Sequence, residues 1–85
     1  MVHIAFDVHE GTLASLRYDP LTFTRELRTA AAVKWYELGR VSQGRAAEIA
    51  GLSRVDFFEA LSRYGVSPFQ ETMEDLAAVL EPKNR

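Results

Sequence analysis

The 85-residue sequence contains no cysteine. This absence excludes a disulfide framework, a cysteine-based zinc site, an iron–sulfur cluster and a thiol nucleophile. The sequence also has no apolar run of the length that a membrane span requires. Its first residues lack the basic region and the apolar core of a signal peptide. These absences indicate a cytoplasmic protein that makes no use of the membrane.

The sequence also lacks a large excess of either positive or negative charge. Ten basic and twelve acidic residues give a formal net charge of −2, so the chain is not the strongly basic kind that binds nucleic acid non-specifically. Any affinity for DNA must therefore be local. With 47% hydrophobic residues, the chain suffices for one small domain over residues 1–85 with a thin core. A homodimer would help such a domain to fold stably.

The sequence has few side chains or motifs that are typical of an active site. The sequence has two histidines, no recognisable nucleophile elbow and no glycine-rich loop for phosphates, so we expect no enzyme activity and no cofactor. His3, Asp7 and His9 would share one face of an extended segment, and imidazole and carboxylate are zinc ligands. No fourth ligand accompanies them, and a solvated strand face is the simpler interpretation. We therefore expect no metal site.

Apolar and polar residues alternate over residues 2–8, and this period of two predicts one half-buried β-strand. A single strand needs a partner, either a tail segment or the same strand of a second copy. Pairing in a homodimer makes Ile4 and Phe6 candidate dimer contacts. A ribbon-helix-helix protein, whose paired strands enter the major groove, is an alternative. Asp7 would then bring the wrong charge to DNA.

The longest predicted helix spans residues 19–39 and follows a short helical turn over residues 10–16. Asp19 is suited to cap it, the following proline fits the first helical position, and Gly39 supplies a left-handed stop. Tyr36 is predicted to be exposed and to contact a second copy or a partner. The apolar residues predicted to face the core are Phe23, Leu27, Ala30, Ala31, Trp35 and Leu38. Ala32, Val33 and Tyr36 lie on the other side of the helix, so we expect one side to pack in the domain and the other against a partner subunit.

Residues 42–64 match a helix-turn-helix. Ala47 is small where the second helix must approach, Gly51 stands where the turn needs a positive φ, and Phe57 follows as an inward apolar residue. This spacing is moderately specific for the motif. A plain helical corner without a ligand is the alternative. The fold class predicted overall is mainly α, with an N-terminal strand followed by a helical bundle that contains the helix-turn-helix.

The charges on the second helix of this unit weaken the DNA hypothesis. Asp56 and Glu59 lie opposite the inward face and repel phosphates, whereas recognition helices usually present basic or amide side chains to bases. Basic and hydroxyl side chains elsewhere in the unit suit phosphate contacts, and a dimer would double their number. The candidate DNA contacts are Arg40, Ser42, Arg45, Ser53, Arg54 and Arg63.

Residues 66–85 form an acidic tail. Met73, Leu76 and Leu80 make a narrow apolar stripe at helical spacing, and Phe69 precedes it. Such a stripe is typical of a helix that binds in a partner's groove, and its acidic neighbours would suit a basic protein surface. The alternative is that the stripe folds back onto the chain's own core.

Four segments carry a family resemblance: Ala31–Arg40, Ser42–Ser53, Phe57–Leu61 and Tyr64–Val66. Together they resemble a family of small prokaryotic helix-turn-helix proteins, formerly catalogued as uncharacterised and described as candidate type II antitoxins. The resemblance implies an antitoxin-like protein that represses its own operon and neutralises a toxin of the PIN-domain ribonuclease type. A helical protein–protein interaction module, or a stand-alone transcriptional regulator without a toxin, remains the alternative.

Overall fold

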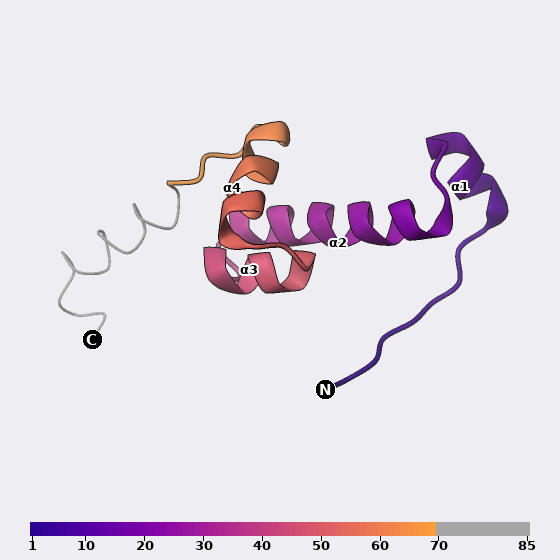
Figure 1. Cartoon of the computed structure of the whole chain (residues 1–85), viewed down its shortest axis with the longest axis horizontal. Helices are drawn as coiled ribbons and strands as arrows, with labels where there is room; N and C mark the ends of the chain where they lie inside the picture. The colour runs from indigo at the N-terminus through magenta and orange to yellow at the C-terminus, as the bar shows by residue number, and fades with distance from the viewer. Residues whose placement is uncertain (70–85) are drawn as a thin grey trace, which may run out of the picture.

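The computed structural model describes residues 1–69, and this part of the chain is mainly α as predicted. It contains four helices: α1 (Glu10–Leu16), α2 (Pro20–Glu37), α3 (Gln43–Ala50) and α4 (Arg54–Arg63). In Figure 1, α3 and α4 lie beside the C-terminal half of α2, while α1 lies at the other end of that helix. None of the helices described has the length and apolarity needed to cross a membrane.

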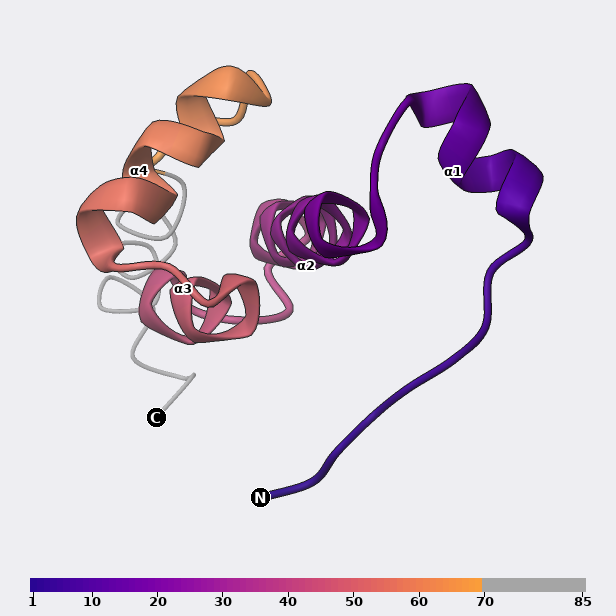
Figure 2. The same cartoon turned by 45° about the vertical axis from the view of Figure 1, so that its right-hand side comes forward.

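The predicted strand over residues 2–8 is not formed. Residues 1–69 contain no β-strand, and the first nine residues run as an uncoiled segment away from the helices (Figures 1 and 2). Ile4 is 80% exposed and Phe6 is 64% exposed. A strand is defined by hydrogen bonds to a second strand, and the described chain offers none. Residues 2–8 therefore have the alternating apolar and polar side chains of a strand but no second strand to pair with in the described chain.

Capping side chains set the starts of the helices as predicted. Asp19 accepts a hydrogen bond from the backbone N–H of Thr22 at 2.7 Å, with Pro20 at the first helical position of α2. Such a cap satisfies one of the unpaired N–H groups of a first turn. The shorter α1 begins in the same way, because the Nδ1 atom of His9 accepts from the N–H of Gly11 at 3.0 Å.

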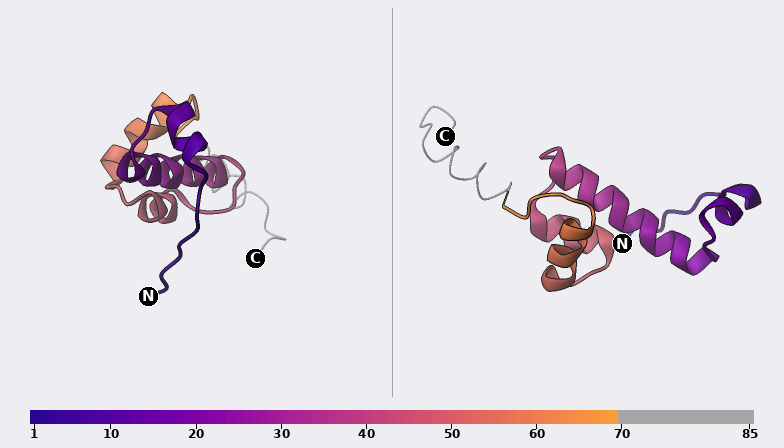
Figure 3. Two further views of the ribbon diagram at one scale, coloured as in Figure 1. Left: turned by 90° about the vertical axis from the view of Figure 1, so that its right-hand side faces the viewer. Right: turned by 90° about the horizontal axis from the view of Figure 1, so that it is seen from above.

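The core lies where α2, α3 and α4 meet. Phe57 and Leu61 of α4 are completely buried, and they pack among small side chains such as Ala32 of α2 and Ala46 of α3. Small residues on facing helices allow the backbones to approach closely, which suits a chain with few large core residues. Figure 3 shows this packing confined to one end of α2.

The predicted inward face of α2 was wrong. The buried residues of α2 are Thr29, Ala32, Val33 and Tyr36, whereas Trp35 is 43% exposed and Leu38 and Leu27 are also exposed. The helix carries two apolar stripes, and the stripe with Thr29 and Tyr36 looked the more polar of the two in sequence. The hydroxyl of Tyr36 donates to the carbonyl of Pro68, and Thr29 is 5% exposed, so the stripe with polar members is the one that packs in the core.

Tyr36 in particular is only 2% exposed, contrary to the predicted surface position. Its ring meets Phe57 edge to face, with centroids 6.3 Å apart, and its hydroxyl donates to the carbonyl of Pro68 at 3.0 Å. The amide nitrogen of Gln43 donates to the same carbonyl, also at 3.0 Å. These two bonds hold the segment after α4 against α2 and α3. Tyr36 is therefore a core residue and is not available as a dimer contact.

Candidate nucleic-acid interface

Helices α3 and α4 are joined by residues 51–53 alone, as the sequence predicted. Gly51 has a φ of 74°, which favours glycine, and the N–H of Leu52 donates to the carbonyl of Ala47 at 2.9 Å. Ala47 and Phe57 are buried between the helices. The three positions on which the helix-turn-helix prediction depended therefore have the burial and backbone geometry expected of them.

An arginine that the sequence did not single out fixes the end of α3. The Nε atom of Arg28 donates to the carbonyl of Ile49 at 2.8 Å, and its Nη2 atom reaches the carbonyl of Glu48 at 3.4 Å. A cation at a helix C-terminus satisfies unpaired carbonyls and complements the helix dipole. Arg28 belongs to α2, so this contact ties the orientation of α3 to the longest helix.

Two candidate DNA contacts are helix caps. The Oγ atom of Ser42 accepts from the backbone N–H of Arg45 at 3.1 Å, and that of Ser53 accepts from the N–H of Asp56 at 3.0 Å. Both serines are exposed. A hydroxyl that accepts through its oxygen still has its own proton to donate, so capping and a phosphate contact are compatible.

Arg54 lies against the first turn of α3. Its Nη2 atom donates to the Oε1 atom of Gln43 at 2.9 Å, and its Nη1 atom is 3.4 Å from where a side chain on Gly44 would begin. The guanidinium therefore adds a full positive charge at a helix N-terminus, which already carries a partial one. The two features together favour an anion at this end of α3.

Arg45 follows on the same helix and pairs with Glu48 at 2.6 Å. Both side chains are largely exposed, and an exposed ion pair of this kind contributes at most about 1 kcal/mol. A phosphate group can therefore compete for this arginine.

The remaining candidates lie elsewhere. Arg40 follows α2 and is exposed, with its backbone N–H donating to the carbonyl of Trp35 at 2.8 Å. Arg63 is at the far end of α4, where its guanidinium carbon lies 5.8 Å from the ring centre of Tyr64. Nine helical steps of about 1.5 Å separate Arg63 from Arg54. The structure thus gathers Ser42, Arg45 and Arg54 around the start of α3 and leaves Arg63 apart from them.

The outer face of α4 is more apolar than the sequence analysis expected. Val55 and Phe58 are exposed there, and the ring of Phe58 meets that of Phe69 edge to face at a centroid distance of 6.4 Å. Val55 and Phe58 also line a shallow hollow with Gln43 and Arg54. We call Val55, Phe58 and Phe69 the outer apolar cluster. The spacing of Val55 and Phe58 on a helix face was the signal that could have revealed it.

Comparison with known proteins places this arrangement in a family. The model of the uncharacterised protein family UPF0175 matches residues 1–82 of the chain. The chain belongs to the UPF0175 family. A UPF0175 protein of Aeropyrum pernix is 41% identical over 78 residues, which cover 92% of this chain and 82% of that protein. No solved structure matches at a significant level. Membership of this uncharacterised family identifies relatives of the small helical protein.

The other predicted contacts of this UPF0175 protein fall into those within the described residues and those outside them. Ile4 and Phe6, proposed for dimerisation, are exposed, and Phe69, proposed for partner binding, is 60% exposed. The positions of Met73, Leu76 and Leu80 lie outside the described residues. No group of three potential metal ligands comes together in the part of the chain that the structure describes.

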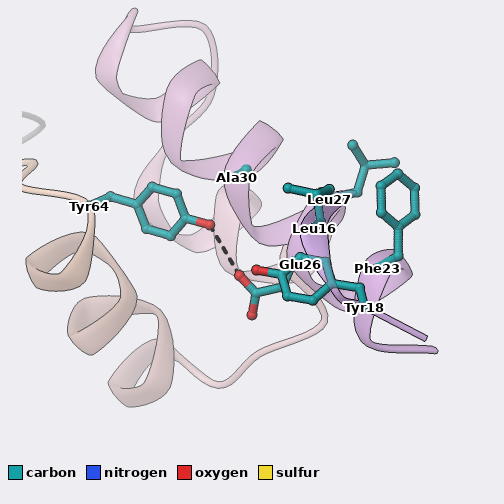
Figure 4. A pocket seen from close by; sticks show the side chains of 7 residues that line it. All are labelled: Leu16, Tyr18, Phe23, Glu26, Leu27, Ala30 and Tyr64. Atoms are coloured by element: carbon teal, nitrogen blue, oxygen red, sulfur yellow. Dashed lines mark hydrogen bonds between the residues drawn. The ribbon is translucent and has the colours of Figure 1, made fainter. Parts of the chain in front are cut away.

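A second hollow, of about 220 Å³, opens between α1, α2 and the end of α4 (Figure 4). At its edge the hydroxyl of Tyr64 donates to the Oε1 atom of Glu26 at 3.4 Å. Burial raises the pKa of the Tyr64 hydroxyl, and the neighbouring Glu26 carboxylate raises it further. The hollow is otherwise lined mainly by apolar side chains: Leu16, Tyr18, Phe23, Leu27 and Ala30.

Proposed function

We propose that this UPF0175 protein is an antitoxin-like DNA-binding protein of a type II toxin–antitoxin pair. In this proposal it binds the operator of its own operon as a homodimer and neutralises a ribonuclease toxin of the PIN type. The observation that carries the DNA-binding part is the position of Arg54, whose guanidinium is held by Gln43 at the first turn of α3. The toxin part comes from the sequence resemblance to candidate antitoxins.

Positive groups at the start of α3 support phosphate binding. The α3 N-terminus, the Arg54 guanidinium, the exposed Arg45 side chain and the Ser42 hydroxyl are all suited to a phosphate backbone. Asp56 and Glu59 limit what α4 can do in a groove, because exposed carboxylates repel phosphates. Affinity per chain is therefore modest, and a second copy supplies the additional contacts.

The DNA-binding part can be tested with charge reversal. The probe is a labelled duplex from the region upstream of the protein's own gene, titrated by fluorescence anisotropy at several salt concentrations. We expect Arg45→Glu with Arg54→Glu to abolish binding at moderate salt. Replacing both arginines by alanine removes four phosphate contacts per dimer, so the slope of log affinity against log salt becomes shallower by about four.

Arg25→Glu is the matched control, because Arg25 is exposed on the first half of α2. It changes the charge by the same amount as either single reversal, at a site away from α3, and should leave most of the affinity intact. Circular dichroism should confirm that the Arg54 variants fold, since Arg54 also holds Gln43. Binding that survives the double reversal but is lost in Arg25→Glu would exclude the start of α3 as the DNA contact.

A second candidate function is a protein–protein interaction module without a DNA role. The observation that favours it is the outer apolar cluster beside the carboxylates of Asp56 and Glu59. An exposed apolar group rimmed by charge is typical of a protein-binding surface. In the antitoxin proposal the same cluster contributes to toxin binding.

The toxin part can be tested by capture from the native host with the tagged full chain, with and without nuclease treatment. We expect one small protein that remains after nuclease treatment and whose ribonuclease activity the added chain inhibits. Phe58→Ser with Phe69→Ser should weaken capture, while Leu21→Ser, at an equally exposed position on α2, should not. Capture of a protein without ribonuclease activity, together with no DNA binding, would favour the interaction module.

A further inference from the structure

The N-terminal segment presents an apolar surface that the described chain leaves uncovered. Val2, Ile4, Phe6 and Val8 are all exposed, and the segment leads away from the three packed helices (Figures 1 and 2). Its backbone N–H and carbonyl groups have no strand beside them within residues 1–69. An extended segment with an apolar face and free backbone groups is suited to pairing with another strand.

We propose that residues 2–8 of two copies of this chain pair as antiparallel strands centred on Ala5. The inference deepens the homodimer of the proposed function and rests on it only for the existence of a dimer. It names the strand, the register and the residues that meet across the two-fold axis. The partner is a second copy because the sequence of this segment is complementary to itself about Ala5.

The alternation of side chains restricts the register. When two identical strands pair antiparallel, the two-fold axis that relates them has its centre either on a residue or between two residues. A centre between two residues would place apolar side chains of one copy on the polar face of the other. A centre on a residue keeps all apolar side chains on one face. The pattern therefore allows centres at Ile4, Ala5 or Phe6 and excludes the positions between them.

Only the centre at Ala5 pairs every apolar residue with another. Val2 then lies opposite Val8 of the second copy, and Ile4 lies opposite Phe6. A centre at Ile4 leaves Val8 without an opposite residue. A centre at Phe6 sets Val2 opposite Glu10, which the structure places in α1. Directly opposed apolar side chains stabilise an antiparallel pair, so the centre at Ala5 is favoured.

The polar face selects the same register. With Ala5 at the centre, His3 lies opposite Asp7 of the second copy, and the two-fold axis repeats this pair. A centre at Phe6 would instead set His3 opposite His9. The carboxylate of Asp7 can accept a hydrogen bond from an imidazole N–H of His3, whereas a pair of imidazoles contains no carboxylate. Because Asp7 lies on the outer face in this arrangement, the ribbon serves association and does not read DNA.

A two-stranded ribbon is marginally stable without a surface to cover its apolar face. The exposed stripe of α2, with Leu27, Trp35 and Leu38, is such a surface. It lies on the helix that follows the segment and α1, and α3 and α4 pack against a different face of α2. In the dimer, the apolar face of the ribbon then packs on this stripe of α2.

Because the natural chain has no cysteine, single cysteines report the register directly. Full-length Ala5→Cys, treated with a short thiol-specific cross-linker, should form a covalent dimer. Asp7→Cys alone should not, because its two thiols would be four residues apart along the ribbon, about 13 Å. A mixture of His3→Cys and Asp7→Cys chains should form the mixed dimer.

Sedimentation of uncross-linked protein provides the second measurement. The natural chain should be a dimer, Phe6→Ser should shift it to monomer, and Leu21→Ser should have no effect. A monomeric natural chain, a dimer unaffected by Phe6→Ser, or self-linking of Asp7→Cys in place of Ala5→Cys would overturn the inference. A monomeric natural chain would also contradict the homodimer of the proposed function. The cross-linking and the Phe6→Ser result test the strand and its register alone, because they use neither DNA nor toxin.

Discussion

The molecule has two regions: the N-terminal arm, residues 1–18, and the packed region made by α2, α3 and α4. They have similar local structure, but their residues are buried to very different extents. The seven-residue α1 has a capping side chain and ends at Arg17 in the left-handed region, with a φ of 60°. The eight-residue α3 begins with the same kind of cap and ends at Gly51 in the same region. Yet α1 buries none of its residues, whereas half of α3 is buried.

This difference shows that caps determine where a helix begins and do not determine whether it is stable. An isolated helix as short as α1 or α3 is marginal in water, so α3 must obtain its stability from burial against α2 and α4. In the arm, by contrast, no residue of α1 is buried within the described chain. We therefore interpret the packed region as the folded unit and the arm as a segment that depends on a second copy.

The largest expected effect compares one phenylalanine from each region. Phe57→Ala removes a completely buried ring and should lower the free energy of unfolding by about 3–5 kcal/mol, a large share of the stability of a domain of this size. Phe6→Ala should change the stability of the monomer by less than about 0.5 kcal/mol, because the ring is exposed. Urea unfolding at low protein concentration measures both values. Equal losses would contradict the division into two regions.

A smaller effect is expected from one glycine in each region. Gly51→Ala should cost about 1–3 kcal/mol, because its φ of 74° disfavours a side chain and the new carbon would lie 3.1 Å from the Arg28 guanidinium. Gly11→Ala lies in α1 with an ordinary backbone and should favour that helix without raising the stability of the packed region. Thermal unfolding followed by circular dichroism would measure the effect of each variant on the stability of the packed region. A strong global effect of Gly11→Ala would show that α1 belongs to the folded unit.

The smallest effect concerns Asp19, at the junction of the two regions. Hydrogen bonds from the side chain and backbone of Thr22 hold the pKa of Asp19 below its ordinary value of 3.8. The folded state therefore favours the charged form, and this stabilisation is present above pH 3.8 and is lost as the pH falls through the lowered value. Asp19→Asn keeps a capping oxygen without the titration. The difference in stability between the two proteins should be constant near neutral pH and shrink in acid.

Local signals were the predictable part of this molecule. Asp19, Ser42 and Ser53 cap helices by accepting from a backbone N–H three residues away, and Gly51 adopts the φ that its turn requires. Such features depend on near neighbours, so the sequence determines them directly. The same holds for Phe57, whose inward position follows from its spacing from Gly51.

Features that depend on distant partners were not predictable in the same way. The inward face of α2 was chosen wrongly because Thr29 and Tyr36 hide the packing stripe until α3 and Pro68 supply their surroundings. Arg28 donates to carbonyls 20 and 21 residues away, and the contact between Phe58 and Phe69 crosses the turn after α4. The alternation at residues 2–8 predicts a strand only where a second strand is present.

A footprint on the DNA upstream of the gene tests the central claim most directly, because it requires both regions at once. With the natural chain, hydroxyl-radical cleavage should show two symmetric protected segments separated by one helical turn or a multiple of it. Arg45→Glu with Arg54→Glu should remove both, and Phe6→Ser should weaken them by preventing the dimer. Protection that is unchanged in both variants would contradict DNA binding through α3 and association through the arm.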